Sequence, residues 1–196
     1  MVKKGGRKTI SITLTHPLVR SQQVKIQNNN EKIRIRLARS EDAITLGKLW
    51  FAQRTYHQQW DELYASVPKA KHDWVKQLLT WLPQKNHCVL VAEDEYGYIL
   101  GYVHGSYHSW PISPFEHYGS LNTIAVAEEA RGCGIGRKLV IELINWFKEQ
   151  KIQHISIHVD YRNRVALNLY RSVGFRSYQH RLMLNLSNDA ECSSVP

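Results

Sequence analysis

Three glycines stand within five residues at Gly132, Gly134 and Gly136, where the segment RGCGIGRKL (131–139) joins an apolar run to a long helix-like segment. Glycine weakens helices, so its repetition directly before a helix needs a physical reason. Two interpretations fit the pattern. Either the backbone must come close to a large anion such as a phosphate, or the glycines only permit a flexible joint and tight packing of the helix on its strand.

Two familiar glycine-rich patterns are excluded by the spacing. The dinucleotide-binding fingerprint is GxGxxG, whereas this loop reads GxGxG. The Walker pattern needs GK followed by Ser or Thr, but Gly136 is followed by Arg137 and Lys138. A general anion site remains, because a helix start presents free N–H groups and the positive end of its dipole. With Arg131, Arg137 and Lys138 beside it, such a site suits a pyrophosphate.

Strand-like and helix-periodic segments follow one another along the chain and predict a mixed α/β sheet with helices on both faces. The expected strands cover 33–39, 87–94, 98–109, 119–126, 152–159 and 181–186. The expected helices cover 41–53 after a Ser40 cap, about 71–82, a segment from the glycine loop to about 150, and 163–173 with Gly174 as C-cap.

The net charge of +9 comes from one end of the chain. Residues 1–40 hold 10 Lys and Arg against one acidic residue, whereas residues 41–196 hold 16 of each sign. We therefore expect a basic, disordered extension over 1–31, a single domain over 32–187 and a flexible tail over 188–196. Nucleic acid is not an expected partner, because the excess of basic residues lies outside the domain.

Two compositional features favour a cytoplasmic protein. Cys88, Cys133 and Cys192 form no CxxC pair and leave one thiol over if two bond, which is usual in a reducing compartment. No apolar run has the length needed to span a bilayer, so no membrane partner is expected. The basic N-terminus leaves organellar targeting open.

A second motif lies downstream of the glycine loop. It consists of five residues within NRVALNLYRSVGF: Asn163, Ala166, Tyr170, Gly174 and Phe175. Together with R-x-x-G-x-G over 131–136 and LNTIAV over 121–126, this motif resembles the GNAT family of acyl-CoA-dependent N-acetyltransferases. The resemblance covers about residues 33–186. It implies a mostly antiparallel sheet whose fourth and fifth strands splay apart. It also implies transfer of the acetyl group of acetyl-CoA to a primary amine by direct attack in a ternary complex.

The resemblance assigns residues to the acyl donor. Pantetheine would pair with the exposed backbone of the fourth strand, at Ile124, Ala125 and Val126. The pyrophosphate would lie on the loop, whose members are Arg131, Gly132, Cys133, Gly134, Ile135, Gly136 and Arg137. Asn163 would bond the pantetheine, cap its helix, or do both. Tyr170 would be the general acid that protonates the leaving thiolate, or else a core aromatic residue.

The general base departs from the family pattern. Many members carry a Glu on the fourth strand where this chain has Ser120, which cannot take a proton near neutral pH. The leading alternative is Glu116, followed by His117, His108 and Asp160. A weak base suits an acceptor of low basicity, since an α-amine is far less protonated at neutral pH than a lysine-like amine.

The acceptor is expected between the segment 53–74 and the loop 110–118. The candidate substrate-binding residues are Tyr56, Trp60, Tyr64 and Ser120. Aromatic faces suit a cationic amine, although the same rings could form a hydrophobic lid. The acceptor class stays open between a small amine, an aminoglycoside-like amine and a peptide. Whether the protein forms a homodimer also stays open.

The sequence allows two further interpretations. His154, His158 and Asp160 share one face of a strand, but polar residues alternate on any half-exposed strand, so no metal is expected. Because the strand Glu is missing, a non-catalytic acyl-CoA-binding regulatory domain is the main alternative to an enzyme.

Overall fold

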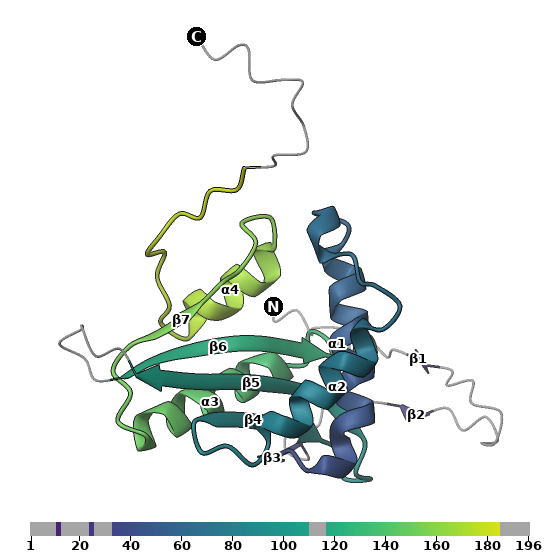
Figure 1. Ribbon diagram of the computed structural model, residues 1–196. Coiled ribbons are helices and arrows are strands. Elements are labelled where there is room, and N and C mark those ends of the chain that lie inside the picture. Colours follow the sequence, from purple (N-terminus) through teal and green to yellow (C-terminus); the bar gives the residue numbers. More distant parts are fainter. Residues whose placement is uncertain (1–10, 13–23, 26–32, 110–116, 185–196) are drawn as a thin grey trace, which may run out of the picture.

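A computed structural model describes residues 11–12, 24–25, 33–109 and 117–184 (Figure 1). Two short strands, β1 (Ser11–Ile12) and β2 (Val24–Lys25), pair antiparallel with each other. The rest of the expected extension 1–31, the expected tail 188–196 and Glu116 lie outside the described residues. Within the described part, no helix combines the length and apolarity needed to cross a bilayer.

Five strands form the central sheet in the order β3-β4-β5-β6-β7, and all neighbours are antiparallel except β6 and β7. The strands are β3 (Arg34–Leu37), β4 (His87–Glu93), β5 (Ile99–Ser109), β6 (His117–Val126) and β7 (Ile155–Ile157). The helices are α1 (Ala43–His57), α2 (Ala70–Trp81), α3 (Ile135–Glu149) and α4 (Arg164–Ser172), with 3-10 turns η2 (Ser40–Asp42), η3 (Glu62–Tyr64) and η4 (Glu128–Ala130). The expected mixed, mostly antiparallel sheet is confirmed.

Helices cover both faces of this sheet, as the sequence predicts (Figure 1). On one face α3 lies close to the strands, because a Cβ built at Gly105 or Gly119 would come within 2.9 Å of Phe147. The absence of side chains at these two glycines therefore permits the close approach. On the other face α1 and α2 cover a buried cluster of Ala43, Leu46, Trp74, Leu78, Val89, Val91, Tyr102 and Ala125.

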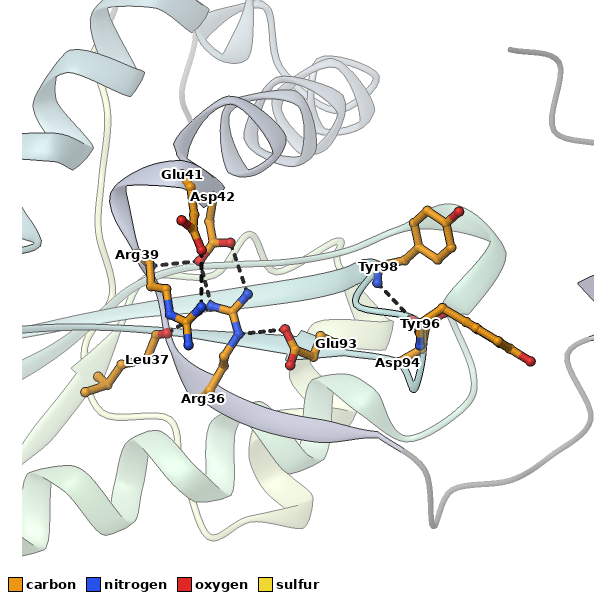
Figure 2. Close-up of polar contacts among 9 residues, drawn as sticks. All are labelled: Arg36, Leu37, Arg39, Glu41, Asp42, Glu93, Asp94, Tyr96 and Tyr98. Carbon is orange, nitrogen blue, oxygen red and sulfur yellow. Dashed lines mark hydrogen bonds and ion pairs between the residues drawn. The ribbon is translucent and has the colours of Figure 1, made fainter. Parts of the chain in front are cut away.

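A partly buried ion-pair network fixes the start of α1 to the sheet (Figure 2). Arg36 on β3 donates to both carboxylate oxygens of Asp42, at 2.7 and 3.1 Å, and to Glu93 on β4 at 2.6 Å. Asp42 also accepts the backbone N–H of Arg39 at 2.7 Å. The expected Ser40 cap is wrong: Ser40 is the first residue of η2, the N-cap is Arg39, and the Asp42 carboxylate accepts the Arg39 N–H.

The C-terminal half differs from expectation at its strands and agrees at its last helix. β7 is shorter than the expected 152–159, because it pairs with β6 only at the beginning of that strand. The expected strand at 181–186 is not formed over its described residues 181–184, where Leu182 is 91% exposed. Gly174 ends α4 at φ +102°, with Phe175 N–H bonded to Tyr170 C=O, as expected for a glycine C-cap.

Candidate active site

The fourth and fifth strands of the sheet separate after three paired residues. The parallel register of β6 and β7 runs from Gly119–Ile155 to Leu121–Ile157 and then stops, although β6 continues to Val126 (Figure 1). An irregularity in the β5–β6 register at the same point places Asn122 between the paired residues Leu121 and Thr123. The expected splay is therefore present, and it exposes one edge of β6.

The backbone of Ile124 and Val126 faces this open edge. Ala127 N–H donates to Leu100 C=O on β5 at 2.8 Å, which fixes the alternation along β6. Residues of an antiparallel strand direct both backbone groups alternately to one side and the other. Ala125 therefore bonds β5, while the N–H and C=O groups of Ile124 and Val126 point into the opening.

The glycine loop turns the chain from the end of β6 into α3. Gly132 and Gly134 have φ of +77° and +78°, a left-handed conformation that residues with a Cβ rarely adopt. Within the described part of the chain, nothing accepts a hydrogen bond from the N–H groups of Ile135, Gly136 and Arg137. These donors and the helix dipole form an anion site beside the open edge.

Gly136 serves a different purpose from the other two glycines. It lies within α3, and a Cβ built on it would meet Leu169 of α4 at 3.4 Å. That distance is ordinary van der Waals contact, so an alanine fits. Gly136 therefore reflects helix packing, while Gly132 and Gly134 are required by the backbone turn.

The Arg131 side chain contacts both α1 and the end of β6. Its guanidinium lies over the Tyr56 ring of α1, 5.2 Å from the ring centroid, and its Nε donates to Val126 C=O at 3.3 Å. The loop is thereby linked to α1 across the end of β6. Arg137 is exposed beside the free N–H groups.

Asn163 is the N-cap of α4, and Tyr170 lies on that helix. Asn163 Oδ1 accepts Ala166 N–H at 3.0 Å, so the expected capping role is confirmed. Tyr170 is 5% exposed and packs edge-on against Phe175. Burial raises the pKa of the Tyr170 phenol well above its usual value, so the hydroxyl keeps its proton at neutral pH.

The expected acceptor wall forms one aromatic cluster at the end of α1. Tyr56 packs edge-on against Trp60 at 5.2 Å, while His57 stacks on Trp60 at 5.1 Å and meets Tyr64 at 5.3 Å. Burial lowers the pKa of His57, and the nearby Asp160 carboxylate partly opposes this shift. His57, which the sequence analysis did not select, is therefore a neutral imidazole in this wall at pH 7.

Arg162 ties the acceptor wall to the segment between β7 and α4. Its guanidinium bonds Asp160 at 2.7 and 2.9 Å, donates to Trp60 C=O, and lies 4.0 Å from Asp61. Hydrogen bonds from Arg162 lower the pKa of Asp160. Asp160 is therefore poorly suited as a base, since a carboxylate held in its charged form takes up a proton reluctantly.

The other base candidates lie on β5 and β6. Ser120 pairs with Ser106 on β5 and Ser156 on β7 and is half-buried. His117 packs edge-on against Tyr107 at 5.5 Å, and His108 is exposed with its ring 6.2 Å from that of Tyr118. Among the described residues, no three His, Cys, Asp or Glu side chains come together in a way that could hold a metal ion.

Gln53 on α1, which no sequence pattern singles out, reaches the open edge directly. Its Nε2 donates to Ile124 C=O at 2.5 Å, and its Oε1 accepts from Thr123 Oγ1 at 3.0 Å. The partners lie about 70 residues away in the sequence. No local motif therefore signals this contact.

Known proteins resemble this chain in sequence and in fold. A mycothiol acetyltransferase of Renibacterium salmoninarum is 30% identical over 44% of this chain and 25% of its own length. An N-alpha-acetyltransferase of Caenorhabditis elegans is 32% identical over 48% of this chain and 49% of its own length. The chain thus spans a quarter to a half of the length of these curated relatives.

Solved structures share the fold at lower identity. A Bacillus halodurans protein crystallised as a tetramutant has a TM-score of 0.70 at 22% identity, covering 78% of this chain and 99% of its own. A predicted acetyltransferase of Clostridium acetobutylicum, solved with acetyl-CoA, has a TM-score of 0.64 at 18% identity, covering 80% and 97%. The family model described as Acetyltransferase (GNAT) family matches residues 52–175, which is more than half of the sequence. This chain therefore belongs to the GNAT family of acetyltransferases.

Proposed function

We propose that this protein transfers the acetyl group of acetyl-CoA to a primary amine by direct attack in a ternary complex. The observation that carries the proposal is the open edge of β6 beside a helix start with free N–H groups. An extended arm with a pyrophosphate at one end fits this combination, since the edge can pair with amides and the helix start can hold phosphate oxygens. Acetyl-CoA has that shape.

In this proposal the glycine loop, the edge of β6 and the start of α4 each bind a different part of acetyl-CoA. The free N–H groups of Ile135, Gly136 and Arg137 hold the pyrophosphate, and the edge backbone from Ile124 to Val126 pairs with the pantetheine. Asn163 lies at the start of α4, where its capping bond uses the side-chain oxygen and leaves the amide nitrogen for a ligand carbonyl. The Clostridium acetobutylicum neighbour, which was solved with acetyl-CoA, supports this ligand.

The chemistry follows from the thioester. The amine nitrogen adds to the carbonyl carbon, the resulting tetrahedral oxyanion collapses, and the C–S bond breaks to release the CoA thiolate. Tyr170 donates a hydrogen bond and then its proton to that thiolate, because a phenol is in its protonated form at neutral pH. The proton lost by the amine goes to a base or to water.

The acceptor proposal is an amine of low basicity that docks against the aromatic wall of Tyr56, Trp60 and Tyr64. Such an amine is often neutral at pH 7, so a chain with Ser120 in place of the strand Glu can use it. The names of the mycothiol acetyltransferase and N-alpha-acetyltransferase relatives are consistent with amine acceptors.

The test combines binding and turnover of acetyl-CoA. Acetyl-CoA should raise the melting temperature in a dose-dependent way, and CoA should be released with at least one member of a panel of small amines, aminoglycosides and N-terminal peptides. Gly134→Val should abolish the thermal shift, because valine does not adopt the +78° φ of this position. A thermal shift without turnover across the panel would favour the non-catalytic regulatory domain. A parent protein without a thermal shift would refute the proposal.

A further inference from the structure

Both outward carbonyl groups of β6 in the opening are already bonded by side chains. Gln53 Nε2 donates to Ile124 C=O at 2.5 Å, and Arg131 Nε donates to Val126 C=O at 3.3 Å. The N–H groups of Ile124 and Val126 point to the same side as their carbonyls. This edge therefore offers hydrogen-bond donors to a ligand, while its own acceptors are satisfied by the protein.

The Gln53 amide is held in one orientation from both ends. Its Oε1 accepts from Thr123 Oγ1 at 3.0 Å while its Nε2 faces the Ile124 oxygen. A flipped amide would place two carbonyl oxygens against each other, so the hydrogen-bond network selects the observed orientation. The Arg131 bond is longer and comes from an exposed side chain. A ligand amide can replace the Arg131 bond more easily than the Gln53 bond.

The thioester differs from the rest of the pantetheine arm in a way that matches this edge. Each pantetheine amide carries an N–H that needs an acceptor, whereas the thioester has a carbonyl oxygen and no N–H. Opposite a thioester, a strand carbonyl would be left unpaired. It would also repel the oxygen that becomes negative in the tetrahedral intermediate. A strand carbonyl that already accepts a hydrogen bond from a side chain of the protein is therefore suited to lie opposite the thioester.

Resting on the proposed function, we propose that Gln53 is a positioning residue that keeps the Ile124 carbonyl occupied, so that the Ile124 N–H holds the thioester oxygen. Gln53 exchanges no proton during the reaction. As the amine adds, the electron pair of the C=O bond moves to the oxygen facing Ile124 N–H, and it returns when the thiolate leaves. The contribution of Gln53 should grow as that oxygen becomes charged, so it should appear in kcat rather than in donor binding.

Two substitutions of similar size test the assignment. Gln53→Met removes the donor, and we expect kcat to fall about 10-fold or more. This loss should be smaller than the loss caused by removing an oxyanion donor itself, because Gln53 acts through Ile124. The KM for acetyl-CoA and the Kd for free CoA, which lacks the thioester carbonyl, should stay within about twofold of the parent. Gln77→Met is the matched control, since Gln77 is exposed on α2 and its side chain bonds Thr80.

Gln53→Glu supplies a second readout that a purely structural role would not move. The charged carboxylate faces the Ile124 oxygen with no donor, whereas the protonated acid has the shape of glutamine and can donate again. The rate of Gln53→Glu divided by the parental rate should therefore rise as the pH is lowered. Thermal unfolding of both variants shows whether the fold is kept, and the pH ratio tests the proposal even if Gln53→Met unfolds.

The outcomes separate this inference from the proposed function. If the parent turns over acetyl-CoA and Gln53→Met keeps the parental kcat, or raises only KM, the inference is wrong and the proposed function stands. A Gln53→Glu rate ratio that does not change with pH would also overturn it. If the parent neither binds CoA nor releases it from acetyl-CoA, the proposed function is wrong and this inference falls with it.

Discussion

Replacing Gly132 by alanine tests the left-handed backbone of the glycine loop without any loss of space. Gly132 has φ of +77°, and a Cβ built on it meets no heavy atom within 4 Å. An L-residue with a Cβ is less stable in that region by about 1–2 kcal/mol. Gly132→Ala therefore introduces backbone strain of about that size and no clash.

This strain must appear either in folding or in ligand binding. If the loop keeps its left-handed φ, the free energy of unfolding falls by about 1–2 kcal/mol, which is a drop of about 2–8 °C in Tm for a chain of this size. If the loop relaxes to a negative φ, stability is spared, but acetyl-CoA must restore the native turn. Its affinity then falls about 5- to 30-fold. The two losses should sum to about 1–2 kcal/mol.

Urea unfolding and calorimetric titration with acetyl-CoA measure the two terms separately. Gly132→Asn should recover much of the loss, because asparagine tolerates the left-handed region better than alanine. Gly136→Ala is the second control. Its Cβ meets Leu169 at an ordinary 3.4 Å and helix propensity favours alanine by up to about 1 kcal/mol, so binding should be kept. Parental stability together with parental affinity in Gly132→Ala would refute the reasoning.

Three further changes test the site and the fold. Tyr170→Phe should lower turnover about 100-fold and leave the Kd of acetyl-CoA unchanged; unchanged turnover would assign Tyr170 to the core alone. Asp42→Asn should lower the free energy of unfolding by about 2–3 kcal/mol in urea titrations, whereas Glu41→Gln, in an exposed pair, should change it by less than about 0.5 kcal/mol. Burial alone would raise the pKa of Asp42, but hydrogen bonds from Arg36 and from a backbone N–H outweigh it, and the net pKa is lowered. The stability that Asp42 contributes is therefore present above about pH 4 and lost as the pH falls below it, so the difference between parent and Asp42→Asn should shrink there. Burial lowers the pKa of His57. If His57 takes the amine proton, kcat/KM should therefore rise with pH at values below about 6.5, and His57→Gln should flatten that rise. A rise that instead follows the pKa of each acceptor would exclude His57 as the base.

The features that the sequence predicts well are those decided by neighbouring residues. The glycine loop, the start of α3 and the Gly174 cap each depend on a few consecutive residues, and all three are where the spacing places them. Ser40 is a counterexample, because it lies inside η2 and the preceding N-cap is Arg39, whose N–H bonds the Asp42 carboxylate that Arg36 holds. The start of this helix is thus decided by the ion pair between Arg36 and Asp42.

The features that the sequence could not predict depend on contacts between distant segments. The extent of β7 is set by where β6 turns away from it, which the alternation in 152–159 does not encode. Gln53 and Arg162 look like ordinary polar surface residues in the sequence, and Arg131 is marked there only as part of the anion-binding loop. Each reaches a backbone carbonyl on another element, so its role appears only when the fold brings the two together.

The charges around the aromatic wall support an acceptor that carries little positive charge. Asp61 and Asp160, two carboxylates next to this wall, both lie within 4.0 Å of the Arg162 guanidinium. Arg162 balances half of their combined charge of −2, and the guanidinium of Arg131, which covers the ring of Tyr56, supplies a second positive charge beside the wall. A polycationic acceptor would meet a nearly neutral wall with one aromatic face already occupied by a cation. A single amine of low basicity needs no such compensation, because it is neutral when it attacks. A neutral amine also needs no strong base, which agrees with Ser120 on β6 in the place where a glutamate would otherwise remove the proton.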